Sequence, residues 1–120
     1  MPGPSLHDRQ RSASFRVMPF GKSSVLELEA AWLMTLSAGW QYDQGLPCGP
    51  AANAAKYLAA EAGFQACEQA VMTHGGFGYS KEFHVERYLR ESLIPRIAPI
   101  SPQLILSFIA EKVLGLPKSY

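Results

Sequence analysis

The stretch that decides the fold is residues 54–79, AAKYLAAEAGFQACEQAVMTHGGFGY, in which an alanine-rich run leads into a cluster of glycines. Alanine is the best helix former, so the run predicts a helix from about Pro50 to Thr73. Proline suits the first turn of a helix, because its missing N–H group is no loss there. Small residues recur along this helix and predict a face that another helix can approach closely: Ala55, Ala59, Ala62, Ala66 and Ala70.

The glycine cluster GGFGY, residues 75–79, predicts an irregular turn, because three glycines in four positions oppose any regular element. It is not the phosphate-binding loop of a nucleotide-binding strand–turn–helix unit. It follows a predicted helix rather than a strand, and it lacks the G-x-G-x-x-G spacing. We therefore expect the alanine-rich helix to end at Gly75 and the chain to reverse direction there.

Upstream, residues 24–44 predict a second long helix, which begins at a capping box formed by Ser24 and Glu27 and stops before Gly45. Apolar residues lie on most of its sides, and a helix of this kind needs neighbours in several directions. It therefore favours the middle of a bundle or an oligomer interface. Residues 1–23 contain several prolines, arginines and serines and predict an irregular or disordered leader, with a targeting sequence as the less favoured alternative.

Downstream of the glycines, residues 81–94 predict a shorter helix rich in charge. Prolines at positions 95, 99 and 102 then predict an extended or turning loop. A last helix is expected from Pro102 to about Leu114, with an apolar side formed by Leu104, Ile105, Phe108, Ile109 and Val113.

No strand pattern occurs, so the predicted fold class is all-α: one antiparallel helical bundle over residues 24–120, joined by short connections. A chain of 120 residues that is 48% hydrophobic can form one such domain. Its net charge of +1 gives no basic surface for nucleic acid. We find no run of about 18 uncharged apolar residues and so expect no transmembrane segment.

The sequence has two cysteines, Cys48 and Cys67, in no CxxC pair, and three scattered histidines, so we expect no metal site. Two free thiols are favoured over a Cys48–Cys67 disulfide. They are typical of a reducing compartment, which is the cytoplasm, or an organellar matrix in a eukaryote.

Three pieces, in this order and spacing, resemble the C-terminal helical domain of acyl-CoA dehydrogenases: the AAK…A-EA helix, the AV…GGFGY turn, and VERYLRE at residues 85–91. The resemblance covers about residues 25–120. It implies the later part of that domain's four-helix bundle, an FAD cofactor, an acyl-CoA thioester substrate and an oligomer. In the family, a carboxylate removes the α proton of the thioester while a hydride passes from the β carbon to flavin N5.

The resemblance implies flavin contacts at four positions. Gly75 and Gly76 match the family's glycine turn, which approaches the adenine dinucleotide part of the flavin from a neighbouring subunit. Ser101 and Gln103 match a threonine and a glutamine at the start of the last helix, although for Ser101 a simple N-cap is an equal alternative. Met72 stands where the family commonly has glutamine, so one polar contact is missing.

The resemblance also implies that the family's usual catalytic base is absent from this chain. Many family members carry a catalytic glutamate in an EGT motif, and counting on from Arg90 and Glu91 places Pro99 at its position. Proline cannot accept a proton, and some subfamilies carry the base on an earlier helix that this chain does not include. We therefore nominate no catalytic residue and interpret Glu82, Glu86 and Glu91 as solvated or ion-paired groups.

Arg87 and Arg90 admit a role on the phosphates of coenzyme A, but pairing with Glu86, Glu91 or a helix C-terminus is favoured. The resulting hypothesis is part of an FAD-dependent acyl-CoA dehydrogenase that is inactive alone, either as a homo-oligomer or with a partner chain supplying the missing domains. The alternatives are a non-enzymatic helical oligomerisation or interaction module and a truncated product without a role of its own.

Overall fold

The computed structural model describes residues 3 and 6–118 of the chain, with side chains described at residues 3 and 23–118. Over this part the chain is helical and no strand occurs, which confirms the all-α prediction. In chain order the elements are α1 (Leu6–Asp43), α2 (Gly49–His74), α3 (Gly76–Tyr79), the 3₁₀ turn η1 (Lys81–Phe83), α4 (Val85–Ser92), α5 (Ile94–Ile97) and α6 (Pro102–Lys112).

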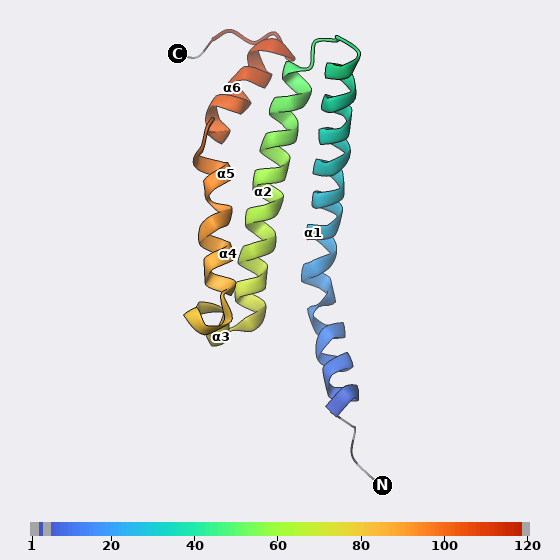
Figure 1. The fold of residues 1–120 in the computed structure, drawn as a ribbon, viewed down its shortest axis with the longest axis vertical. Coiled ribbons are helices and arrows are strands. Elements are labelled where there is room, and N and C mark those ends of the chain that lie inside the picture. Colours follow the sequence, from blue (N-terminus) through green and yellow to red (C-terminus); the bar gives the residue numbers. More distant parts are fainter. Residues whose placement is uncertain (1–2, 4–5, 119–120) are drawn as a thin grey trace.

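α2 is the central element of the fold (Figure 1). α1 runs antiparallel to it on one side, and α4, α5 and α6 follow one another antiparallel to it on the other side. α3 and η1 form the corner at which the chain turns from α2 into α4. The predicted antiparallel bundle is therefore confirmed.

α1 begins at Leu6, well before the start near Ser24 that the sequence predicted. The structure thus differs from the irregular leader expected over residues 1–23, since residues 6–23 are helical. Starting a helix is costly but extending one gains a hydrogen bond per residue, so a helix formed further along can continue backward through a weakly helical segment. The domain boundary near residue 23 stays a prediction.

Small side chains are buried where α2 packs against the helices on either side of it. Ala31 of α1 and three alanines of α2 are buried: Ala55, Ala60 and Ala62. Ser24 is buried as well, and its hydroxyl donates to Gln69 Oε1 at 2.7 Å across the two helices. The predicted capping box at Ser24 is therefore wrong, because this serine lies inside α1 and its oxygen bonds to α2.

The glycine corner is more regular than predicted. Gly76–Tyr79 form one turn of α-helix, α3, where the sequence predicted an irregular turn. The reason is packing, since Gly78 is buried and a Cβ there would lie 2.9 Å from Cα of Val71 in α2. Because Gly78 has no Cβ, α3 can lie directly on the end of α2.

The proline segment also differs from its prediction. Pro95 lies in the first turn of the short helix α5, where its missing N–H needs no partner, so the chain stays helical up to Ile97 instead of opening at residue 95. The extended backbone is confined to the residues around Pro99. α6 then starts at Pro102 as predicted and ends at Lys112, two residues early.

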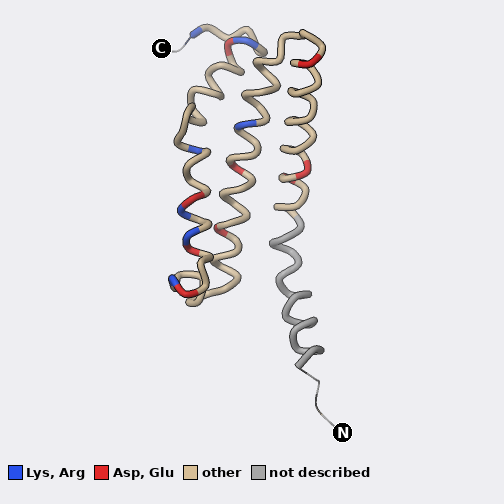
Figure 2. Tube along the Cα trace, viewed as in Figure 1, with Lys and Arg blue, Asp and Glu red and all other residues tan. Residues whose placement is uncertain are grey.

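The outer surface of α1 is apolar. From residue 23 onward its only charged residues are Glu27, Glu29 and Asp43, as the tube coloured by charge shows (Figure 2). Trp32 and Trp40 are 58% and 59% exposed, so these aromatic residues lie outside the core of this chain. The prediction of a helix that needs further neighbours agrees with this surface.

One segment of the described chain, Val85–Lys112, contains an 18-residue window with a mean hydropathy of 1.4 and few charges, enough by composition to span a membrane. Breaks between α4, α5 and α6 divide this segment in the structure. A single window of this kind is weak evidence and establishes no span.

Candidate functional site

The first pair of predicted site residues lies at the end of α2. Gly75 has φ 59° and ψ −135°, a conformation that L side chains rarely adopt, and its N–H donates to the Met72 carbonyl at 3.2 Å. Gly76 opens α3, and a Cβ there would meet no atom within 4 Å. Both glycines are exposed. The corner therefore presents bare backbone to its surroundings at two successive residues.

The second pair lies at the start of α6. Ser101 Oγ accepts a hydrogen bond from the Leu104 N–H at 3.4 Å, which confirms the N-cap interpretation. Gln103 is exposed in the first turn of this helix, whose N-terminal end is weakly positive. An anionic or polar group can approach that end from outside.

The structure does not bring the two pairs together within one chain. α4 and α5 lie between them, and 13 residues of helix from Val85 to Ile97 span about 20 Å. Figure 1 shows α3 at one end of the bundle and the α5–α6 break well along its length. The two pairs therefore form two separate surfaces of the chain.

Side chains around the glycine corner are mostly paired. Nδ1 of His74 lies 2.7 Å from the Ala70 carbonyl, the helix-end hydrogen bond favoured for this residue. Ion pairs join Arg87 to Glu91 at 3.8 Å and Arg90 to Glu86 at 3.6 Å, which confirms the pairing predicted for both arginines. These i,i+4 pairs run along α4 and stabilise it weakly.

Two features of this corner were not predicted. The rings of Phe77 and Phe83 pack with centroids 5.1 Å apart and tie α3 to η1. His84 has φ 59°, in the left-handed region, and so ends η1 and begins α4 with a sharp change of direction. The sequence signal for the first was an aromatic residue inside the glycine cluster and a second one six residues later. We know of none for His84.

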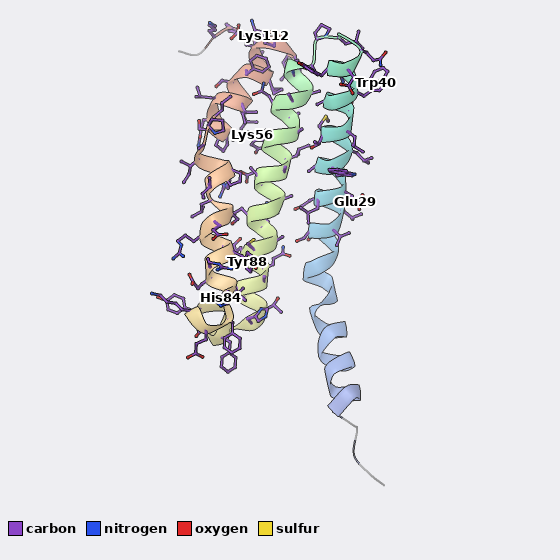
Figure 3. The ribbon with its side chains drawn as sticks, viewed as in Figure 1. Glu29, Trp40, Lys56, His84, Tyr88 and Lys112 are labelled. Atoms are coloured by element: carbon purple, nitrogen blue, oxygen red, sulfur yellow. The ribbon has the colours of Figure 1, made fainter. Side chains whose placement is uncertain are left out.

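The segment around Pro99 is attached to α2 by polar contacts. Nζ of Lys56 lies 2.6 Å from the carbonyl oxygens of both Pro95 and Ile100 (labelled Lys56 in Figure 3). Nε of Arg96 lies 2.9 Å from Glu61 Oε1, and its guanidinium stacks 4.4 Å from the Phe64 ring centroid. Sequence reasoning missed Lys56, although it is the only lysine or arginine in α2.

Other candidate chemistry is sparse in the described part of the chain. Cys48 and Cys67 are both free thiols. Among residues 3 and 23–118, whose side chains the structure describes, no group of three or more His, Cys, Asp or Glu could bind a metal. A hollow of about 330 Å³ lies between α6 and the residues after it, lined by Leu106, Ser107, Ala110, Glu111, Leu116, Pro117 and Lys118. The hydrogen bond from Lys112 lowers the pKa of the Glu111 carboxyl at its edge.

Known proteins share this sequence pattern. Residues 22–114 match the family model of the acyl-CoA dehydrogenase C-terminal domain. The chain is 47% identical over 97 residues to acyl-CoA dehydrogenase FadE12 of Mycobacterium tuberculosis, covering 79% of this chain and 25% of that protein. It is 35% identical over 106 residues to the probable acyl-CoA dehydrogenase YngJ of Bacillus subtilis, covering 88% and 28%.

A third relative, the 3-(aryl)acrylate reductase of Clostridium sporogenes, is 31% identical over 103 residues, with 85% of this chain and 27% of that protein covered. The chain thus spans about a quarter of the length of each of these relatives. The match includes α2, the glycine corner and the start of α6, on which the resemblance was based. The chain therefore belongs to the acyl-CoA dehydrogenase family and carries the helices of its C-terminal domain.

Proposed function

We propose that this chain contributes the C-terminal bundle to an FAD-dependent acyl-CoA dehydrogenase, an oxidoreductase of the CH–CH group of acyl-CoA thioesters. The observation that carries the proposal is the open backbone at Gly75 and Gly76, where no side chain shields the corner. A dinucleotide can approach such a backbone closely and accept hydrogen bonds from it. Exposed Gln103 and the N-capped end of α6 supply the second surface.

The residues present fit a partial flavin site rather than a complete one. The two surfaces lie on different segments, so a bound FAD would meet one surface from this chain and the other from a second polypeptide. That second polypeptide is a further copy of the chain or a partner chain. The two free thiols agree with a reducing location, in the cytoplasm or an organellar matrix.

The chain alone should not turn over acyl-CoA. Pro99 occupies the position of the family's loop glutamate, and a proline ring cannot accept the α proton. We expect no reduction of an electron-acceptor dye when the purified chain is mixed with FAD and a panel of acyl-CoA thioesters. A complete acyl-CoA dehydrogenase in the same assay is the positive control. Robust turnover by the pure chain would show that another residue serves as the base.

The open glycine can be tested directly with Gly76→Ala. A Cβ at this position meets nothing within 4 Å in the chain, so the fold should be unchanged. A bound dinucleotide would meet that methyl group, and overpacking of this kind should weaken FAD binding about tenfold or more. The measurement is an FAD titration followed by flavin fluorescence and by the amide signals of residues 75 and 76.

Gly63→Ala is the matched control for that experiment. A methyl group added at Gly63 would also meet no atom within 4 Å, but this residue lies inside α2 and away from the corner. The affinity of this variant for FAD should equal that of the wild type. Equal affinities for all three proteins would mean that the glycine corner takes no part in binding the flavin.

The second candidate function is a non-enzymatic module for helical oligomerisation. The exposed apolar surface of α1, with Trp32 and Trp40, favours it, because a surface of this kind is unusual on a monomer. Purification distinguishes the two functions. A yellow protein with bound flavin supports the dehydrogenase proposal, whereas a stable colourless dimer that ignores added FAD supports the module.

A further inference from the structure

Lys56 makes the longest-range polar contacts of α2 to the segment around Pro99. It follows Ala54 and Ala55 and is the single lysine or arginine between Gly49 and His74. Its ammonium group donates to the Pro95 carbonyl and to the Ile100 carbonyl, 39 and 44 residues further along the chain, each at 2.6 Å. One side chain thus joins the first turn of α5 to the residue just before the N-cap of α6.

Both carbonyls need a donor that the backbone does not supply. In a continuing helix the Pro95 carbonyl would accept the N–H of residue 99, but residue 99 is proline and has none. The Ile100 carbonyl precedes the N-cap residue Ser101 and so lies outside the hydrogen-bond ladder of α6, whose first acceptor is the Ser101 carbonyl. Two carbonyls are therefore left without helical partners, and the three donors of a lysine ammonium can serve both.

A second set of contacts, made by Arg96, attaches α5 to α2 but does not extend to α6. Arg96 pairs with Glu61 at 2.9 Å and stacks on Phe64, so it fastens α5 to α2 on the near side of the break. Lys56 alone of these residues reaches past Pro99 to the residue next to Ser101. The Arg96 contacts can therefore position α5 only, whereas the Lys56 contacts can also position the start of α6.

We propose that Lys56 is a positioning residue that fixes the start of α6, and through it Ser101 and Gln103, by bridging the Pro95 and Ile100 carbonyls. The part of this inference that concerns cofactor binding rests on the proposed function, because Ser101 and Gln103 are there assigned to an FAD surface. The mechanical part concerns this chain alone. It can be tested without any ligand.

The test compares Lys56→Met, which keeps the length and apolar stem but removes the donors, with Lys56→Arg, which keeps donors and charge. Amide hydrogen exchange is measured on the full 120-residue chain without FAD. The reporter is the Ile105 amide, which donates to the Ser101 carbonyl in the first turn of α6. The Ala60 amide in the middle of α2 reports general opening.

In Lys56→Met the exchange of Ile105 should accelerate about tenfold relative to that of Ala60, because charge-assisted hydrogen bonds are lost at the start of α6. Lys56→Arg should restore most of the protection. Arg96→Met, which removes the other set of contacts, should leave the Ile105-to-Ala60 ratio within about twofold of the wild type. An equal acceleration at both amides, including complete unfolding, would assign Lys56 to general stability and overturn the proposal.

Measuring FAD binding by the same variants separates this inference from the proposed function. If the wild type binds FAD, Lys56→Met should bind it about tenfold more weakly and Arg96→Met should bind it normally. If the wild type does not bind FAD while the exchange ratio changes as expected, the positioning role stands and the flavin proposal fails. An unchanged ratio in Lys56→Met overturns the positioning role whatever the flavin result.

Discussion

Gly78→Ala should unfold the glycine corner. An added Cβ would lie 2.9 Å from Cα of Val71 and 3.0 Å from its carbonyl carbon, and it would also collide with the carbonyl oxygen. These are backbone atoms of α2, which cannot move aside as a flexible side chain could. We expect the free energy of unfolding to fall by about 3 kcal/mol. A loss of this size lowers the melting temperature by about 10 °C or more.

The neighbouring glycine provides the control for this variant. Gly76→Ala places the same methyl group two residues earlier, where no atom lies within 4 Å, and should change the free energy of unfolding by less than about 0.5 kcal/mol. Thermal unfolding followed by circular dichroism compares the two. Equal melting temperatures for the two variants would mean that α3 does not lie against the end of α2 as described.

Ile105→Ala should have the other large effect. Ile105 is 2% exposed and is the one large side chain, among those described, that is almost completely buried. α6 packs against α2, and removing three carbon atoms at this contact loses apolar burial and leaves a cavity. We expect a loss of about 2–5 kcal/mol in the free energy of unfolding, measured by urea denaturation.

Leu106→Ala is the matched control, because this neighbouring leucine is half exposed. It should cost less than about 1 kcal/mol, since part of its surface is already in water. A similar loss for the two variants would contradict the assignment of Ile105 as the anchor of α6.

Sequence patterns predicted the parts of this fold that local chemistry decides. The alanine run fixed α2 to within a residue at each end, and the Ser101-Pro102 pair placed the start of α6, because helix propensity and capping act over a few residues. The pairing of the arginines in α4 followed from their i,i+4 spacing.

The predictions that differed from the structure depended on contacts between distant residues. The Ser24 hydroxyl could cap a helix or bond to a neighbouring helix, and the local sequence allows both. The packing of α1 on α2 decides for the hydrogen bond to Gln69. From its sequence alone the glycine cluster predicts an irregular turn. Its helical conformation depends on the close contact of Gly78 with Val71 of α2. The bridge made by Lys56 joins positions 39 and 44 residues apart, which no local pattern relates.

The resemblance nominated the residues of the candidate site but gave no information on how far apart they lie. The resemblance supplied Gly75, Gly76, Ser101 and Gln103, and their roles toward FAD stay predictions. The length of helix between the two pairs became apparent only with the fold, because α4 and α5 run along α2 rather than folding back over the corner.

The position of α1, on the far side of α2 from α4–α6, has a consequence for how the bundle comes apart. The contact between α1 and α2 is the most extensive between any two elements of the described chain. We therefore expect α1 and α2 to open as one cooperative unit, and the shorter helices α3 to α6 to be the first to lose protection against amide exchange.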